Sequence, residues 1–231
     1  MIQKVDGAEL RRLLLSAAAA IEIGKEKLNE LNVFPVPDGD TGTNMSMTIN
    51  AAAAELRKLE EPTVEKASAT AASAMLRGAR GNSGVIFSQF VHGLYRSMEK
   101  KETVVFADFA DAFALAKEDA YNSILTPTEG TILTVIREAA EFLAANAGNY
   151  TSLADGFDAL LGKMTETIKK TPELLPVLKE ANVVDSGGAG LVCFIEGICA
   201  CLRGEAIPDT ADTAEWSLPD TQAGCFGPDS R

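Results

Sequence analysis

Apolar residues recur at steps of three and four along almost the whole chain, and this period most constrains its fold. In the first segment Leu10, Leu13 and Ala17 follow this spacing, which places them on one face of a helix. Similar segments continue to about residue 202, whereas strand-like runs are confined to residues 104–106 and 183–184. The period therefore predicts an all-α fold of roughly eight helices.

Short polar segments separate the expected helices. Asp6 precedes Glu9 by three residues, as in a capping box. Thr63, followed by Glu65 and Lys66, marks the start of another helix. We expect helices over residues 6–28, 41–59, 63–76, 83–98, 106–125, 131–145, 153–168, 172–181 and 188–202.

The composition changes at Gly204, where prolines and acidic residues begin to interrupt any apolar period. Such a segment does not carry enough apolar surface to pack as an element of its own. The sequence predicts a helical domain over residues 1–203 and an acidic, proline-containing linker or tail over residues 204–231.

The charge balance limits the classes of partner. With 21 basic and 33 acidic residues the formal net charge is −12, so the long-range field would repel a nucleic acid. Residues 1–10 lack the apolar core of a signal peptide, and the apolar stretch over residues 13–23 is too short and alanine-rich to cross a bilayer. We expect a cytoplasmic protein that has no integral membrane segment and binds no nucleic acid.

Three of the four cysteines, Cys193, Cys199 and Cys201, crowd one apolar segment. No Cys-x-x-Cys pair occurs and the single histidine, His92, is distant in sequence, so the spacing typical of a zinc site is absent. We interpret these cysteines as buried small apolar side chains and His92 as a residue of a helix surface.

The loop over residues 32–44 reads Asn-Val-Phe-Pro-Val-Pro-Asp-Gly-Asp-Thr-Gly-Thr-Asn and precedes a helix. Asp38 and Asp40 lie two residues apart, and paired carboxylates beside an amide oxygen such as that of Asn32 are ligands suited to Mg²⁺. A bound cation would also relieve their mutual repulsion. The alternative is a simple Asp-Gly turn, with Asp40 or Thr41 as the N-cap of the next helix.

The segment Gly-Ala-Arg-Gly-Asn-Ser-Gly-Val at residues 78–85 combines three glycines, a hydroxyl and a helix start, which is typical of an anion-binding turn. It matches neither a Walker A loop nor a Rossmann fingerprint, and a glycine-rich turn between two helices remains the alternative.

Residues 127–133 and 185–190 also place glycine and hydroxyl residues before an apolar helix. The four segments stand at alternate helix junctions, which lie at the same end of an up-and-down helical array. One rim would then collect carboxylates, backbone amides and hydroxyls, as a metal–nucleotide site requires.

The four segments, in this order, resemble the nucleotide-binding domain of the dihydroxyacetone kinase family, and most closely the N-terminal domain of bacterial fatty acid kinase. They are residues 32–45, 80–86 (Arg-Gly-Asn-Ser-Gly-Val-Ile), 127–133 (Pro-Thr-Glu-Gly-Thr-Ile-Leu) and 184–191 (Val-Asp-Ser-Gly-Gly-Ala-Gly-Leu). The resemblance covers about residues 6–203. It implies a closed barrel of eight antiparallel helices with the nucleotide site at one rim.

The resemblance also implies the cofactors, ATP or ADP with two Mg²⁺ ions, and the site residues. Asp38 and Asp40 are the expected catalytic residues and metal ligands, with Asn32 as a third metal ligand where the family has an aspartate. The residues matched to nucleotide binding are Thr41, Gly42, Thr43, Asn44, Asn82, Ser83, Gly84, Thr131, Ile132, Leu133, Asp185, Ser186 and Gly187.

The implied reaction transfers the γ-phosphate of Mg-ATP to a fatty acid carboxylate on a separate, DegV-like carrier protein, and the product is an acyl phosphate. Family members continue into further domains that engage the carrier, and a homodimer would form through regions beyond this chain. Two alternatives stay open: a nucleotide-binding subunit of a triose kinase of the dihydroxyacetone type, and a non-enzymatic regulator that binds ADP.

Overall fold

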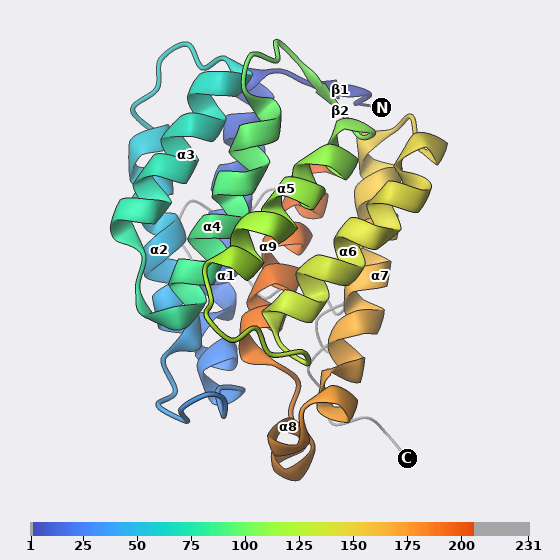
Figure 1. The fold of residues 1–231 in the computed structure, drawn as a ribbon. Helices are drawn as coiled ribbons and strands as arrows, with labels where there is room; N and C mark the ends of the chain where they lie inside the picture. The colour runs from blue at the N-terminus through green and yellow to red at the C-terminus, as the bar shows by residue number, and fades with distance from the viewer. Residues whose placement is uncertain (1, 206–231) are drawn as a thin grey trace.

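The computed structural model describes residues 2–205 (Figure 1). Most of these residues are helical, and the strands β1 (Lys4–Val5) and β2 (Val104–Val105) form one short antiparallel pair. The all-α prediction is therefore confirmed. The helices are α1 (Gly7–Glu30), α2 (Thr41–Leu56), α3 (Val64–Gly78), α4 (Gly81–Met98), α5 (Asp108–Asn122), α6 (Ile132–Asn146), α7 (Leu153–Leu174), α8 (Pro176–Ala181) and α9 (Ser186–Leu202), with a 3₁₀ turn at Ala147–Asn149 after α6.

Helix contacts follow the order of the chain. Each helix from α1 to α7 packs against the next, α7 packs against α9, and α9 returns to contact α1. These are the contacts that a closed ring of eight helices would require. The short α8 packs against α7, at the end of the molecule opposite β1 and β2 (Figure 1).

Helix α9 is buried on nearly all sides, which explains its uniformly apolar sequence. Small residues let α1 approach it closely, and a side-chain carbon at Gly197 would come within 2.6 Å of the Ala17 backbone. The hydroxyl of Ser16 donates to the Gly197 carbonyl at 2.7 Å across the same contact. The alanine-rich part of α1 therefore serves helix packing. No helix within residues 2–205 is long and apolar enough to span a membrane.

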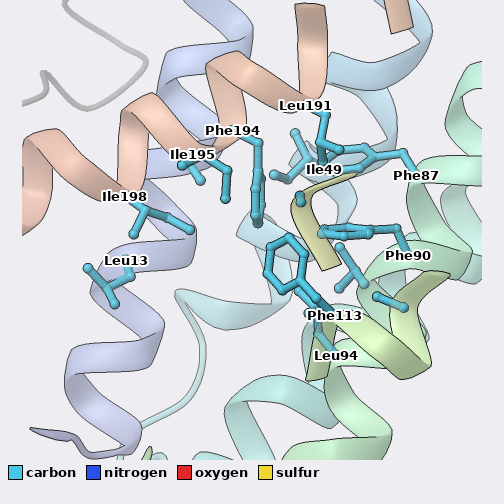
Figure 2. Close-up of a cluster of buried hydrophobic side chains, with 14 of the residues drawn as sticks. Leu13, Ile49, Phe87, Phe90, Leu94, Phe113, Leu191, Phe194, Ile195 and Ile198 are labelled. Carbon is cyan, nitrogen blue, oxygen red and sulfur yellow. The ribbon is translucent and has the colours of Figure 1, made fainter. Parts of the chain in front are cut away.

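An aromatic cluster fills the space between α4, α5 and α9 (Figure 2). Phe90 meets both Phe113 and Phe194 edge to face, at ring-centroid distances of 5.2 and 6.3 Å, and Phe87 meets Phe194 at 5.4 Å. Edge-to-face pairs add to the stabilisation from apolar burial. This core fixes the relative positions of the helices whose ends carry the candidate site.

Helix α7 continues six residues beyond its predicted end at Ile168 and contains Pro172. A proline inside a helix leaves the carbonyl four residues earlier without its N–H donor. Here the hydroxyl of Thr171 donates to that carbonyl, of Ile168, at 2.7 Å. The helix therefore passes the proline, and the short helix predicted over residues 172–181 begins only at Pro176, as α8.

Other boundaries differ by a few residues. Asp6 and Thr63 cap α1 and α3 as predicted, with side-chain acceptors for Glu9 N–H and Lys66 N–H. The strand expected at residues 183–184 is absent, and α5 ends at Asn122 instead of residue 125. Cys193, Cys199 and Cys201 are buried and form no disulfide, as predicted. Of the predicted tail, residues 206–231 lie outside the described part of the chain.

Candidate functional site

The four polar segments predicted to share a rim line one cavity of about 590 Å³. In Figure 1 they lie at the end of the molecule that also holds α8. The residues that line the cavity are Asn32, Phe34, Pro35, Val36, Asp38, Asp40, Thr41, Asn44, Gly81, Asn82, Ser83, Ile86, Ser123, Ile124, Leu125, Thr126, Thr128, Thr131, Ile132, Leu133, Asp185 and Gly187. The set contains three carboxylates and no lysine, arginine or histidine.

Four helices, α2, α4, α6 and α9, begin at this cavity, and two of them begin without a side-chain cap. Asp40 precedes α2 and Arg80 precedes α4, and neither side chain bonds to the first-turn N–H groups. In α4 the first intrahelical bond is that from Gly84 N–H to the Arg80 carbonyl. The N–H groups before it have no partner within the helix, so they can bind an anion.

The starts of α6 and α9 carry side-chain caps. Thr131 accepts from Leu133 N–H at 3.4 Å and donates to the Thr128 carbonyl at 2.7 Å. Asp185 accepts from Gly188 N–H at 2.7 Å. The anion-binding capacity of the cavity is therefore concentrated at α2 and α4.

Asp185 is a buried carboxylate in the cavity wall. Burial raises its pKa to about 6, although backbone hydrogen bonds from Gly188 and Ile132 oppose the rise. Its own N–H donates to the Thr171 hydroxyl at 3.1 Å, which ties the loop before α9 to the end of α7.

Asp38 and Asp40 both line the cavity on the loop between α1 and α2. Within residues 2–205, no side-chain hydrogen bond or ion pair joins either carboxylate to another residue. Asp40 is the N-cap residue of α2 by position, but its carboxylate makes no capping bond, so the cap alternative does not explain the side chain. Two unpartnered carboxylates at one cavity suit a divalent cation.

Asn32 braces this loop. Its amide oxygen accepts from Asp40 N–H at 3.1 Å, and its amide nitrogen donates to the carbonyls of Val36 at 3.1 Å and Phe34 at 3.4 Å. The oxygen predicted as a third metal ligand therefore already holds the loop that carries the two aspartates, with one lone pair left.

The residues present fit Mg²⁺ held together with phosphates. In the described part of the chain no group of three or more histidine, cysteine, aspartate or glutamate side chains could hold a metal alone. Mg²⁺, however, is usually bound through one or two carboxylates, with phosphate and water oxygens completing its shell. Asp38 and Asp40 meet that requirement beside the first N–H groups of α2 and α4, apart from Thr43 N–H, which the Asn29 side chain already engages.

Four of the predicted binding residues lie outside the lining, each in a packing contact. Gly42 faces the Lys25 carbonyl, and Gly84 faces the Thr48 hydroxyl, which a side-chain carbon there would approach to 2.4 Å. Thr43 N–H and hydroxyl both bond to the Asn29 side chain at 3.0 Å. Ser186 donates to the Leu28 carbonyl at 2.5 Å. Gly84, predicted to bind nucleotide, therefore allows α2 and α4 to pack closely together.

The sequence reasoning missed the wall formed by residues 123–126. Residues 123–125 fall in the predicted helix over residues 106–125, whereas α5 ends before them and Ser123, Ile124, Leu125 and Thr126 line the cavity. Pro127 gave the signal, since the residue before a proline disfavours the helical conformation. The exposed apolar side chains of Val36 and Leu125 stand on different loops of the same lining.

His92 lies on α4 away from the lining residues, as predicted. Its Nδ1 is 2.7 Å from an Asp119 carboxylate oxygen, and the other oxygen of Asp119 binds Arg96 at 2.6 Å. This group joins α4 to α5 on the protein surface.

Comparisons with known proteins agree with this description. Protein YloV of Bacillus subtilis is 40% identical over 210 residues, and an uncharacterized protein of Staphylococcus aureus is 37% identical over 207 residues. The matches cover 91% and 90% of this chain but only 38% of each relative, so the chain spans less than half of their length.

Among solved structures, the dihydroxyacetone kinase from C. freundii in complex with AMP-PNP and Mg²⁺ matches with a TM-score of 0.64. It is 18% identical, and the match covers 87% of this chain and 35% of that one. The native form of the same kinase matches with a TM-score of 0.57. Residues 35–200 match the DAK2 domain family, and these residues include all four segments of the cavity except its first three loop residues. The chain therefore belongs to the DAK2 domain family.

Proposed function

We propose that this chain is the ATP-binding domain of a kinase that transfers the γ-phosphate of Mg-ATP to a fatty acid carboxylate on a separate carrier protein, and so forms an acyl phosphate. One observation carries the proposal: a single cavity holds two unpartnered carboxylates, Asp38 and Asp40, beside two helix N-termini without side-chain caps. The dihydroxyacetone kinase from C. freundii, part of which has the same fold, was solved in complex with AMP-PNP and Mg²⁺, which supports the same class of ligand here.

The charges of the cavity require a metal for this ligand. The lining has no cationic side chain, and the chain carries a formal net charge of −12. A triphosphate would meet only the partial positive charge of the helix ends, opposed by the nearby aspartates. Mg²⁺ would supply the missing positive charge and polarise the phosphate to be transferred.

The chain's own residues would divide the work. Asp38 and Asp40 hold the metal, and the N–H groups that open α2 and α4 bind phosphate oxygens. Ile132 and Leu133 offer an apolar surface for the base on the side of α6, where Thr131 already caps the helix. This arrangement orients the triphosphate and excludes water from its apolar side, and such positioning suits a loose phosphoryl-transfer transition state.

The lining favours a carboxylate over a hydroxyl as the acceptor. A hydroxyl must lose its proton during transfer, and the lining offers only carboxylates as bases, of which Asp38 and Asp40 are assigned to the metal. A fatty acid carboxylate is already deprotonated at neutral pH and needs no base. This difference supports a fatty acid acceptor over a triose.

The acceptor would arrive on a DegV-like carrier protein. The relatives are more than twice as long as this chain, and we propose that their further domains dock the carrier and form any homodimer.

Titration calorimetry tests the nucleotide site. We expect the chain to bind ATP with Mg²⁺ and to bind it much more weakly in excess chelator. Asp38→Asn and Asp40→Asn should each reduce the gain in ATP affinity that Mg²⁺ provides. Asp111→Asn, at an exposed position of α5, should not reduce it. Equal affinity in chelator would refute the metal-bridged site.

A transfer assay tests the reaction. ATP and a fatty-acid-loaded carrier should give acyl phosphate with a longer relative of this chain, and dihydroxyacetone in place of the carrier should give no product. Transfer to dihydroxyacetone alone would instead support the triose kinase.

A further inference from the structure

The loop between α5 and α6 forms a whole wall of the cavity. Six of its residues belong to the lining: Ser123, Ile124, Leu125, Thr126, Thr128 and Thr131. Leu125 is fully exposed, whereas the adjacent Ile124 packs against the hydrophobic core. Beyond Leu125 the loop is held by polar contacts.

Those contacts converge on Glu129. One oxygen of its carboxylate accepts from the Tyr121 hydroxyl at 2.8 Å, near the end of α5. The other accepts from the Thr134 hydroxyl at 2.5 Å and from Arg137 at 3.3 Å, both on α6. Glu129 therefore links the two helices between which the loop runs, beside a longer contact of 3.2 Å from the same Tyr121 hydroxyl to the Leu133 carbonyl.

Thr134 extends the link to the backbone of the loop. Its buried hydroxyl oxygen accepts from Gly130 N–H at 2.7 Å. Gly130 has a φ of +83°, and a side-chain carbon there would lie 2.8 Å from Leu175 and 3.0 Å from Leu174, so the chain is also pressed against the end of α7. The last turn of the loop is thus fixed on two sides.

The Glu129 carboxylate itself is not part of the lining, and its side chain is 48% exposed. The hydrogen bonds from Thr134 and Tyr121 and the charge of Arg137 lower its pKa, although burial opposes the shift. The group is therefore charged at neutral pH, and of its three partners only Thr134 is buried.

We infer that Glu129 is a positioning residue for the nucleotide. It fixes residues 123–131 as the cavity wall next to Ile132 and Leu133, the residues of α6 proposed to contact the adenine base. The inference rests on the proposed function. Without the carboxylate the loop would sample several conformations, and the bound nucleotide would have to order it. Nucleotide affinity should fall, while the helical core, which Glu129 does not enter, should keep its stability.

Three variants test the inference. Glu129→Ala removes all three contacts, and Glu129→Gln keeps an acceptor and a similar shape. Glu141→Ala is the matched control, because Glu141 also binds Arg137, at 3.2 Å, but contacts no residue of the loop. Calorimetry with Mg-ATP measures affinity, urea unfolding measures stability, and hydrogen exchange of the nucleotide-free protein measures the mobility of residues 123–130.

We expect Glu129→Ala to weaken Mg-ATP binding about tenfold or more, with an unchanged urea midpoint and faster exchange confined to the loop. Glu129→Gln should recover part of the affinity, and Glu141→Ala should match the wild type in all three measurements.

Three results would overturn the inference. They are an unchanged affinity in Glu129→Ala, an equal loss in Glu141→Ala, and a loss of affinity that follows a fall of the urea midpoint. If the wild-type chain bound no nucleotide, the proposed function itself would fail, and the exchange data would still show whether Glu129 orders the loop.

Discussion

The hydroxyl of Thr171 accepts a hydrogen bond from the backbone N–H of Asp185 at 3.1 Å. The same hydroxyl donates to the Ile168 carbonyl at 2.7 Å, which Pro172 leaves without its helical donor. One buried side chain thus satisfies a defect inside α7 and anchors the loop that brings Asp185 into the cavity wall. The irregular helix and the candidate site depend on the same hydroxyl.

Thr171→Val should therefore lower the free energy of unfolding by about 2 kcal/mol, because it leaves a buried N–H and a buried carbonyl without partners. Thr171→Ser keeps the hydroxyl and should lose less. Urea unfolding of the two variants checks this, and a smaller loss in Thr171→Val than in Thr171→Ser would show that the methyl group, not the hydroxyl, matters at this position.

Asp38→Ala and Asp40→Ala should each abolish Mg²⁺-dependent nucleotide binding and phosphoryl transfer while the fold is kept. Each removes a proposed metal ligand, but also one of two neighbouring negative charges, so the melting temperature without ligand should hold or rise. Thermal unfolding with and without Mg-ATP measures both effects. A large fall without ligand would favour a purely structural role for the turn.

The pKa of Asp185, raised by burial to about 6, makes stability depend on pH. Between its unfolded value, about 3.8, and about 6 the folded protein binds more protons than the unfolded one, so the free energy of unfolding falls as the pH rises. The fall amounts to about 3 kcal/mol at most.

Asp185→Asn should remove this part of the pH dependence, because the amide does not titrate and can still accept from Gly188 N–H. Urea unfolding of both proteins at about pH 4.5 and about pH 7 measures the difference. Parallel pH profiles would mean that Asp185 titrates at its usual value.

Gly84→Val should destabilise the protein by about 1–3 kcal/mol through overpacking. A side-chain carbon at Gly84 would lie 2.4 Å from the Thr48 hydroxyl. That hydroxyl donates to the Asn44 carbonyl and accepts from the N–H of Arg80, the residue that precedes α4. Displacement of Thr48 should therefore also weaken nucleotide binding.

Gly162→Ala provides a contrast in the same unfolding assay. This glycine lies inside α7 with no atom within 4 Å of the added carbon, so alanine should stabilise the protein by about 0.5–1 kcal/mol. Similar losses at both glycines would contradict the packing argument.

The chain by itself should bind nucleotide but transfer phosphate slowly. Holding an acceptor against the γ-phosphate contributes up to ~7–11 kcal/mol to lowering the barrier, and we expect that docking to need the further domains of the longer relatives. Acyl phosphate formation by this chain and by a longer relative, with the same loaded carrier, measures the difference. Comparable rates would show that the helical domain docks the carrier alone.

The sequence determined the helices and the residues that open them. The apolar period of α1 and the caps Asp6 and Thr63 are local properties, because a helix satisfies its backbone within one segment and buries one face. The position of the polar segments at alternate junctions also predicted, correctly, that they meet at one end of the molecule.

Only the tertiary structure decided which members of those segments face the cavity. Thr43, Gly84 and Ser186 stand beside lining residues in the sequence, but Asn29, Thr48 and the Leu28 carbonyl on neighbouring helices engage them. Contacts between residues distant in the chain, such as those of Gly84 with Thr48 and of Ser186 with Leu28, carry no local signal. The physical reason is that a local pattern sets the conformation of a segment, whereas the neighbours that complete its hydrogen bonds are chosen by packing.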